Sequence, residues 1–189
     1  MNRPLKFFLI IAGGALTLLL SLLVAGFIML RSAGWVLTHV IDSEPASVTE
    51  VGRSIADYDV PDRYADAYAV EVADFSMVTY HNVDTDGHIY LIQMPETMQV
   101  DPAVLETQLR VASGTEVLAE VAVVHHMPCR IRGQETTLVI SEGLNHDNRP
   151  YRSASAIFPG KGGQALINIS GPIEDWDQTM VDSFVGSFQ

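Results

Sequence analysis

The most marked feature of the hydrophobic pattern is a long uncharged run near the N-terminus. No residue from Phe7 to Leu30 is charged, and Arg31 ends the run. At ~1.5 Å per residue an α-helix of this length would be about 36 Å long, enough to cross a hydrocarbon core of ~30 Å. The apolar part of a signal peptide is shorter, usually about 7 to 15 residues. The pattern therefore predicts a transmembrane helix, and a signal peptide cleaved near Ala25 or Ala33 stays the alternative.

The charges that flank this run set its expected orientation. Arg3 and Lys6 precede it, and short flanks rich in Lys and Arg stay cytoplasmic. We therefore expect a cytoplasmic tip and transmembrane anchor over residues 1–34, a connector over 35–45 and an extracytoplasmic domain over 46–189. This arrangement predicts a single-pass protein of a bacterial inner membrane, with its C-terminal domain outside the cytoplasm.

Helical spacing of apolar residues marks three segments of the domain. We expect helices at 47–58, 101–114 and 175–188. The first is supported by Ser47 and Glu50, which together have the form of a capping box. Two of the three helices thus flank a region whose apolar residues follow a different period.

That region alternates apolar and polar residues with a period of two, which predicts strands. Turn residues such as Asp84-Thr85-Asp86-Gly87 and Pro159-Gly160-Lys161-Gly162-Gly163 separate the alternating segments. The expected strands cover 64–72, 75–80, 88–94, 115–126, 129–132, 135–141, 150–158 and 164–170. Because hairpins dominate, the predicted fold class is α+β, with an N-terminal transmembrane helix followed by an antiparallel sheet with packed helices.

Three stretches of the domain carry a family resemblance. They are Arg132-Gly133-Gln134, Tyr151-Arg152, and Leu166 to Gly171 leading into Asp175-Trp176-Asp177. Over residues 46–189 this arrangement resembles PsbP-like α/β sandwich domains, and the whole chain is similar to uncharacterised bacterial membrane-anchored proteins. PsbP-like domains are mostly non-enzymatic accessory or assembly factors. The resemblance therefore implies a sandwich fold and a binding role, and it brings no catalytic residue with it.

Charge narrows the range of partners. The chain of 189 residues has a net charge of −12, and none of its 23 acidic residues lies within residues 1–34. An acidic domain repels phosphate groups, which argues against nucleic acid and anionic lipid headgroups as partners. Cys129 is the single cysteine, so the chain cannot form an internal disulfide.

The densest group of candidate ligands is a short stretch near this cysteine. His125, His126, Met127 and Cys129 bring imidazole, thioether and thiolate donors together, a set suited to Cu(I) or another soft metal. Adjacent residues of a strand point to opposite faces, so both histidines could bind one ion only if Pro128 broke the strand. The alternative is an ordinary strand end with Met127 or Cys129 in the core.

Other catalytic and metal patterns are incomplete. Asp84, Asp86 and Gly87 resemble the start of a calcium loop, but the later positions lack its glycine and glutamate, which favours a solvated turn. No G-x-S-x-G elbow is present, and Cys129 has no flanking signature of a nucleophile. A hydrolase site formed only by the fold stays an open alternative.

The predicted anchor carries a stripe of small residues. Gly13, Thr17, Ser21 and Ala25 recur at every fourth position, where another helix could approach closely. Small residues are also common in membrane helices generally. The stripe is the sequence feature that points to a membrane-protein partner or a homodimer.

These observations favour one function among three. We expect a membrane-anchored accessory or binding module without evident catalysis and without a cofactor. A soft-metal protein that uses His125, His126, Met127 and Cys129 is the first alternative, and an unrecognised hydrolase is the second.

Overall fold

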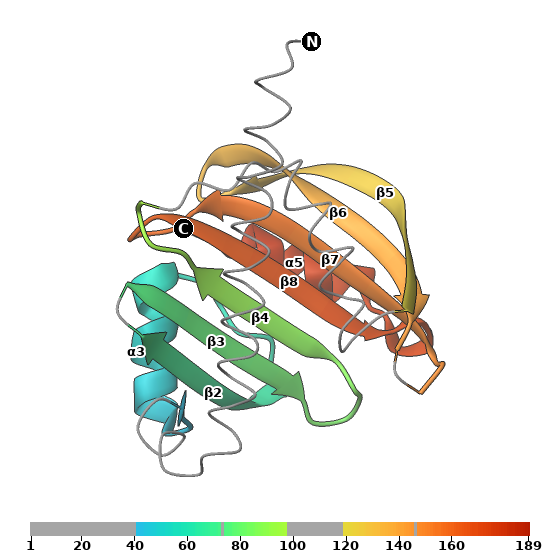
Figure 1. The fold of residues 1–189 in the computed structure, drawn as a ribbon, viewed down its shortest axis with the longest axis horizontal. Helices are drawn as coiled ribbons and strands as arrows, with labels where there is room; N and C mark the ends of the chain where they lie inside the picture. The colour runs from blue at the N-terminus through green and yellow to red at the C-terminus, as the bar shows by residue number, and fades with distance from the viewer. Residues whose placement is uncertain (1–40, 73, 98–118, 146) are drawn as a thin grey trace, which may run out of the picture. The chain divides into compact units, whose positions relative to one another are not determined.

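In the part of the chain that the structure describes, eight strands pair antiparallel in one sheet, in the order β1-β2-β3-β4-β8-β7-β6-β5 (Figure 1). The structure is a computed structural model that describes residues 41–72, 74–97, 119–145 and 147–189. The strands are β1 (Ile41–Asp42), β2 (Tyr64–Val72), β3 (Phe75–Asn82), β4 (His88–Gln93), β5 (Ala119–Ile131), β6 (Gln134–Leu144), β7 (Pro150–Pro159) and β8 (Gln164–Pro172).

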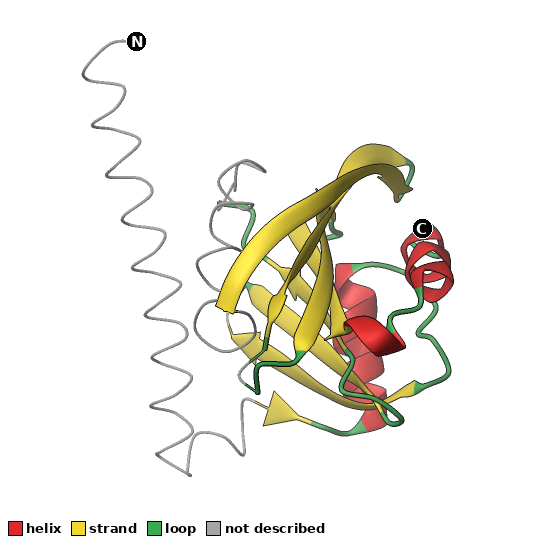
Figure 2. Cartoon of the chain, turned by 90° about the vertical axis from the view of Figure 1, so that its right-hand side faces the viewer, coloured by secondary structure: helices red, strands yellow, loops and turns green. Residues whose placement is uncertain are grey.

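Two α-helices and one short 3-10 helix complete the described elements. They are α3 (Pro45–Ile55), η1 (Ile173–Asp175) and α5 (Gln178–Gly186). Both α-helices lie on the same side of the curved sheet (Figure 2). Helix α3 packs against β2, β3 and β4, and α5 contacts β5. The sheet therefore has a face that the helices cover and an opposite face, called the far face below.

The pairing of β4 with β8 joins two groups of strands, in each of which strands that follow one another in the chain pair antiparallel. One group is β1 to β4 and the other is β5 to β8, and their shared ladder aligns His88 with Ser170 and Gln93 with Ala165. Because side chains alternate along each strand, this register fixes which residues of both groups share a face.

The hydrophobic core lies between the sheet and the helices. Alternate strand residues face it, among them Val78, Ile89, Leu91, Ile167 and Ile169, each of which is fully buried. The helices contribute Val48, Val51, Ile55, Val181, Phe184 and Val185. Burying a side chain of this size stabilises the fold by ~1.5–3 kcal/mol, so this layer holds the helices against the sheet.

An aromatic cluster joins the end of α5 to the segment that follows α3. The Tyr58 ring stacks on Phe188 with centroids 5.1 Å apart and meets Phe184 edge-on at 5.8 Å. Its hydroxyl is hydrogen-bonded to the Tyr80 hydroxyl at 2.7 Å. Burial raises the pKa of both tyrosines. Gly52 of α3 makes room for this pair, since a Cβ there would lie 2.2 Å from the Tyr58 hydroxyl oxygen.

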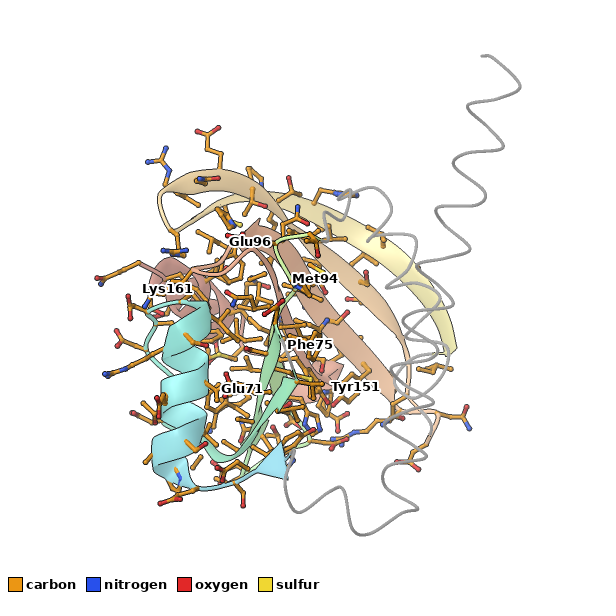
Figure 3. All side chains as sticks on the ribbon, turned by 60° about the vertical axis from the view of Figure 1, so that its left-hand side comes forward. Glu71, Phe75, Met94, Glu96, Tyr151 and Lys161 are labelled. Atoms are coloured by element: carbon orange, nitrogen blue, oxygen red, sulfur yellow. The ribbon has the colours of Figure 1, made fainter. Side chains whose placement is uncertain are left out.

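Lys161, in the turn between β7 and β8, donates hydrogen bonds to the carbonyls at the C-terminal end of α3 (Figure 3). Its backbone N–H donates to the Ile55 carbonyl at 2.9 Å and its Nζ donates to the Arg53 carbonyl at 2.9 Å. The last carbonyls of a helix lack partners within the helix, and a cation there also complements the helix dipole. The ammonium pairs with Asp57 at 2.8 Å and lowers the pKa of that carboxyl.

The fold class predicted from the sequence is wrong. The described residues form mostly an antiparallel β-sheet with two α-helices, so strands dominate where an α+β fold with an N-terminal transmembrane helix was expected. None of the described helices has the length and apolar character needed to cross a membrane. The structure therefore gives no support for the expected N-terminal transmembrane helix.

Some expectations concern residues that the structure does not describe. The segment 7–30, its stripe of Gly13, Thr17, Ser21 and Ala25, and the helix expected at 101–114 lie outside the described residues. The inner-membrane location and the partner expected through the stripe rest on that segment.

The start of the first helix of the domain differs from the prediction. Helix α3 begins at Pro45 with Glu44 as its N-cap, which makes no side-chain cap bond, so Ser47 does not cap the helix. Proline at the first helical position has its φ already set for a helix and needs no N–H partner there. The Ser47 hydroxyl instead interacts with Asp42. The Glu44 N–H, which donates to the Asp42 carboxylate at 2.8 Å, lowers the pKa of that carboxyl, and Ser47 lowers it further.

We predict that the two hydroxyls of Tyr58 and Tyr80 stabilise the fold as a pair. Tyr58→Phe and Tyr80→Phe should each lower the free energy of unfolding by about 1–2 kcal/mol, because each leaves a buried hydroxyl without its partner. The double variant should cost less than the sum of the two, which urea denaturation can measure. Tyr68→Phe is the matched control. Strict additivity of the two losses would contradict the prediction.

Candidate functional site

A cleft of about 350 Å³ opens at one end of the sheet on the helix side. It lies where the turn between β3 and β4 meets the end of β8 and the start of α5. Its lining residues are Pro61, Asp62, Arg63, Tyr64, Asn82, Thr85, Gly87, Ile169, Ser170, Gly171, Pro172, Asp175, Trp176, Asp177 and Met180. The cleft thus combines an apolar and aromatic lining with several carboxylates.

The floor of the cleft depends on two glycines. A Cβ on Gly87 would lie 3.0 Å from the Tyr64 hydroxyl oxygen, a tight contact that Tyr64 could relieve only by shifting. An added Cβ on Gly171 would meet only the Gly87 Cα, at an ordinary contact distance of 3.5 Å. Gly171 therefore leaves space in the cleft that a larger side chain would fill.

Polar groups on this floor are already positioned by the fold. The Tyr64 side chain is buried and interacts with the Asn82 side chain, and burial raises the pKa of its hydroxyl. The Asn82 side-chain oxygen also accepts the Asp84 N–H at 2.9 Å. The Asn82 N–H donates to the Gly87 carbonyl at 2.8 Å, which closes the turn. These groups need little ordering when a ligand binds, which reduces the entropic cost of binding.

Trp176 forms one wall of the cleft and is held in place from two directions. Its Nε1–H donates to the Gln178 side-chain oxygen at 3.1 Å. The Arg152 guanidinium lies 5.6 Å from the centroid of its ring, within the range of a cation–π contact. Arg152 is itself held by Glu142, whose carboxylate accepts from its Nε at 2.8 Å. The ring is therefore a fixed platform.

Carboxylates give the cleft its electrostatic character. Asp62, Asp175 and Asp177 line it together with one cation, Arg63. Asp175 is paired with Arg149 at 3.3 Å, and Asp177 caps α5 by accepting the Met180 N–H at 3.1 Å. In a chain of net charge −12, this lining favours a positively charged group over an anion.

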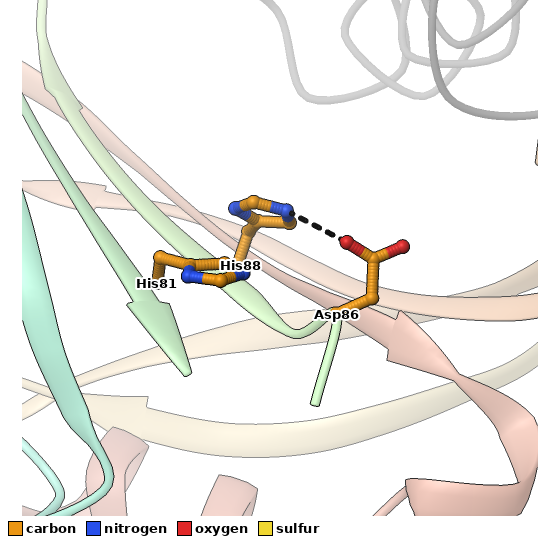
Figure 4. Close-up of side chains that lie close together, drawn as sticks. All are labelled: His81, Asp86 and His88. Atoms are coloured by element: carbon orange, nitrogen blue, oxygen red, sulfur yellow. Dashed lines mark ion pairs between the residues drawn. The ribbon is translucent and has the colours of Figure 1, made fainter. Parts of the chain in front are cut away.

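A second group of functional side chains lies at the same turn, on the far face. His81 is the last residue but one of β3 and His88 begins β4, and they are directly opposite each other in the ladder. Their ring centroids are 4.8 Å apart, and His88 Nε2 lies 3.6 Å from Asp86 Oδ1 (Figure 4). One ligand atom from each of the three residues lies within 4.8 Å of the others. In the described parts of the chain, no other group of three such residues comes together in this way.

His88 is prepared to act as a neutral ligand. Burial lowers the pKa of its imidazole, and the neighbouring His81 lowers it further, while Asp86 opposes both effects. The ring also stacks on Tyr90, with centroids 5.9 Å apart. A neutral imidazole in a fixed orientation is the form that binds a metal ion.

The residues predicted for a soft-metal site all lie on β5. The strand continues through Pro128 to Ile131, so Pro128 does not break it. His125, Met127 and Cys129 pair with alternate residues of β6, whereas His126 occupies the intervening position and faces the other way. His125 and His126 are exposed, while Met127 and Cys129 are partly buried against the core.

This arrangement separates the expected donors. Alternate residues of a strand are about 6.6 Å apart, and residues four positions apart, such as His125 and Cys129, are separated by about 13 Å of backbone. The ladder thus sets His125 and Cys129 on either side of Met127 on one face, about 13 Å apart, and turns His126 to the other face. Cu(I) binding by this stretch stays a prediction.

The sequence analysis missed the residues that the fold brings together at the β3–β4 turn. Asp84, Asp86 and Gly87 were interpreted as a solvated turn, and the two histidines that flank it, His81 and His88, were not considered. Their symmetric placement around a turn between two predicted strands was the available signal. This signal indicates a site only when the cross-strand register, in which His81 is opposite His88, is known.

No protein-family model matches the chain, and no curated protein matches it significantly. The resemblance to PsbP-like domains therefore stays an expectation from the residues quoted for it.

We predict that Cys129 is a slow nucleophile at neutral pH. Burial raises the pKa of its thiol, so little thiolate is present to react. Iodoacetamide should alkylate it at least about tenfold more slowly than an exposed cysteine, because the rate follows the thiolate fraction and access. The control is Glu135→Cys combined with Cys129→Ser, which places the thiol on the exposed start of β6. Equal rates for the two proteins would refute the prediction.

Proposed function

We propose that the domain formed by residues 41–189 is a binding module, and that its ligand occupies the cleft lined by Tyr64, Gly171 and Trp176. The observation that carries this proposal is the combination of a fixed aromatic wall, a polar floor and surplus carboxylates in one concavity. Binding sites are commonly concave and mainly apolar, with a few polar groups that fix orientation.

The lining indicates the chemical class of the ligand. Trp176 and Met180 offer apolar contact, and Asp62 and Asp177 offer negative charge without an oppositely charged ion-pair partner in the described residues. A ligand that joins a cationic group to an apolar or planar group would satisfy both parts. The acidic chain disfavours phosphates, nucleic acids and other polyanions as ligands.

An accessory role is part of the same proposal. The resemblance of residues 46–189 to PsbP-like domains implies binding rather than catalysis. A cationic side chain or terminus of a partner protein has the same chemistry as a small cationic ligand, so the cleft suits recognition of a partner as well.

We predict that the cleft distinguishes a cation from an anion of similar size. The probes are phenyltrimethylammonium and benzenesulfonate, added to the full-length Trp35→Phe protein. The chain has two tryptophans, so the fluorescence of this variant comes from Trp176 alone. The cation should bind at least about tenfold more tightly, a difference of ~1.4 kcal/mol, because the carboxylates attract one probe and repel the other.

Two further variants locate this binding. Gly171→Leu should fill the cleft and weaken cation binding at least about tenfold, a loss of ~1.4 kcal/mol. Gly186→Leu is the matched control, because an added Cβ on Gly186 has no atom within 4 Å. Equal affinity for both probes, or a Gly171→Leu protein that binds as well as its control, would count against the cleft as the ligand site.

A further inference from the structure

The turn between β3 and β4 presents three metal-ligating side chains on the face opposite the cleft. We propose that His81, Asp86 and His88 bind one divalent transition-metal ion of the zinc class. This site is independent of the function proposed for the cleft, because its ligands point to the far face and none of them lines the cleft.

The first argument is the position of the ligands in the hairpin. His81 and His88 form a directly opposed cross-strand pair, and the side chains of such a pair start about 4.5–5.5 Å apart on the same face. Tyr80 and Ile89, their neighbours in sequence, are both buried in the core, which places the two imidazoles on the far face. Two imidazoles are thus brought together by the ladder itself.

The second argument is distance. Ligand atoms at ~2.0–2.1 Å from a tetrahedral zinc ion are separated by roughly 3.4 Å. The separation of 3.6 Å between His88 Nε2 and Asp86 Oδ1 is already close to this value. The His81 ligand atom lies within 4.8 Å of the other two, a gap that rotation of one partly exposed side chain can close. The site therefore needs adjustment of side chains and no change of backbone.

The third argument is that the turn holds Asp86 in place before any ion binds. Its carbonyl oxygen accepts a hydrogen bond from the Tyr151 hydroxyl of β7. The next residue, Gly87, donates its N–H to the Thr85 hydroxyl at 3.2 Å, and its carbonyl accepts the Asn82 N–H at 2.8 Å. A ligand on a fixed turn loses little conformational freedom on binding, which increases the affinity of a site.

The donor set decides the class of metal. Two imidazole nitrogens and one carboxylate oxygen suit Zn²⁺ and the neighbouring ions Co²⁺ and Ni²⁺. Calcium and magnesium prefer sites made of oxygen ligands only, and Cu(I) prefers thiolate and thioether. Three protein side chains leave one coordination position of a tetrahedral ion open, which water or a small molecule can fill.

The test titrates the full-length chain with Zn²⁺ alone against a chromogenic chelator. The wild-type protein should bind about one equivalent, as a single site requires. His81→Ala and His88→Ala should each weaken binding more than about tenfold, since loss of even an outer partner costs ~10–100-fold. Asp86→Asn should weaken it as well, because an amide oxygen carries no charge.

The control removes side chains of the same kind elsewhere, two at once where each test variant removes one. His125→Ala combined with His126→Ala deletes two exposed histidines of β5 and should leave Zn²⁺ binding unchanged. This control separates a built site from adventitious binding by surface histidines. It also separates the present site from the Cu(I) stretch on β5.

Two readouts guard against a variant that fails to fold. Co²⁺ should give the visible absorption bands of a tetrahedral site with wild-type protein and lose them with His88→Ala. Zn²⁺ should also raise the melting temperature of the wild-type protein but not that of His88→Ala, because an ion that binds only the folded state stabilises it. Gly171→Leu should keep metal binding, so failure of the cleft proposal would leave this result untouched.

Zn²⁺ affinity that survives His81→Ala and His88→Ala, or that disappears with the β5 control, would overturn the proposal. So would a wild-type protein that shows neither stoichiometric Zn²⁺ binding nor tetrahedral Co²⁺ bands. In those cases His81, Asp86 and His88 have a structural role at the turn and do not bind a metal ion.

Discussion

The ladder between β4 and β8 is the pairing on which the rest of this structure depends. Apart from the short strand β1, each half of the sheet consists of hairpins between strands that are close in sequence, and such hairpins form by local contacts. β4 and β8 are far apart in the chain, so their pairing closes a longer loop and costs more chain entropy than a hairpin does. The hydrophobic residues of both strands, such as Leu91 and Ile167, face one shared core and offset that loss. The same ladder brings the β3–β4 turn beside the end of β8, which creates the cleft and lets Tyr151 reach Asp86.

The β3–β4 turn therefore serves two faces of the sheet. Asn82 and Gly87 belong to the floor of the cleft, while Asp86 lies with the histidines on the far face. If this turn were free to move, neither the floor of the cleft nor the group of Asp86 and the two histidines would keep a fixed geometry. The hydrogen bonds within the turn and from Tyr151 of β7 hold it in place.

Sequence reasoning could predict the features that depend on neighbouring residues. The hairpin β7–β8 was predicted at nearly its observed bounds, because alternation on both sides of a Gly-rich turn is a local signal. The helix at Ser47 was found but its start was misjudged, since Pro45 offered an equally local signal that a capping box obscured. Features set by the exact register of a hairpin, or by pairing between distant strands, could not be predicted. The alignment of His81 with His88, and the meeting of Trp176 with Tyr64 across the cleft, need a register that periodicity does not contain.

The two edge strands of the described sheet also determine whether a strand of another molecule could pair with it. An unpaired edge strand can template intermolecular β-pairing and aggregation unless its backbone is interrupted. At one end β1 is only two residues long. At the other, β5 has thirteen residues, but Pro128 lacks an N–H to donate, and the ladder register shifts between Ala119 and Ala122 and again between Val123 and His125. These interruptions break the row of evenly spaced donors and acceptors that an added strand would need. Pro128 does not break β5, and it thus interrupts the donors along the longest edge strand of the described sheet, which disfavours pairing with another chain there.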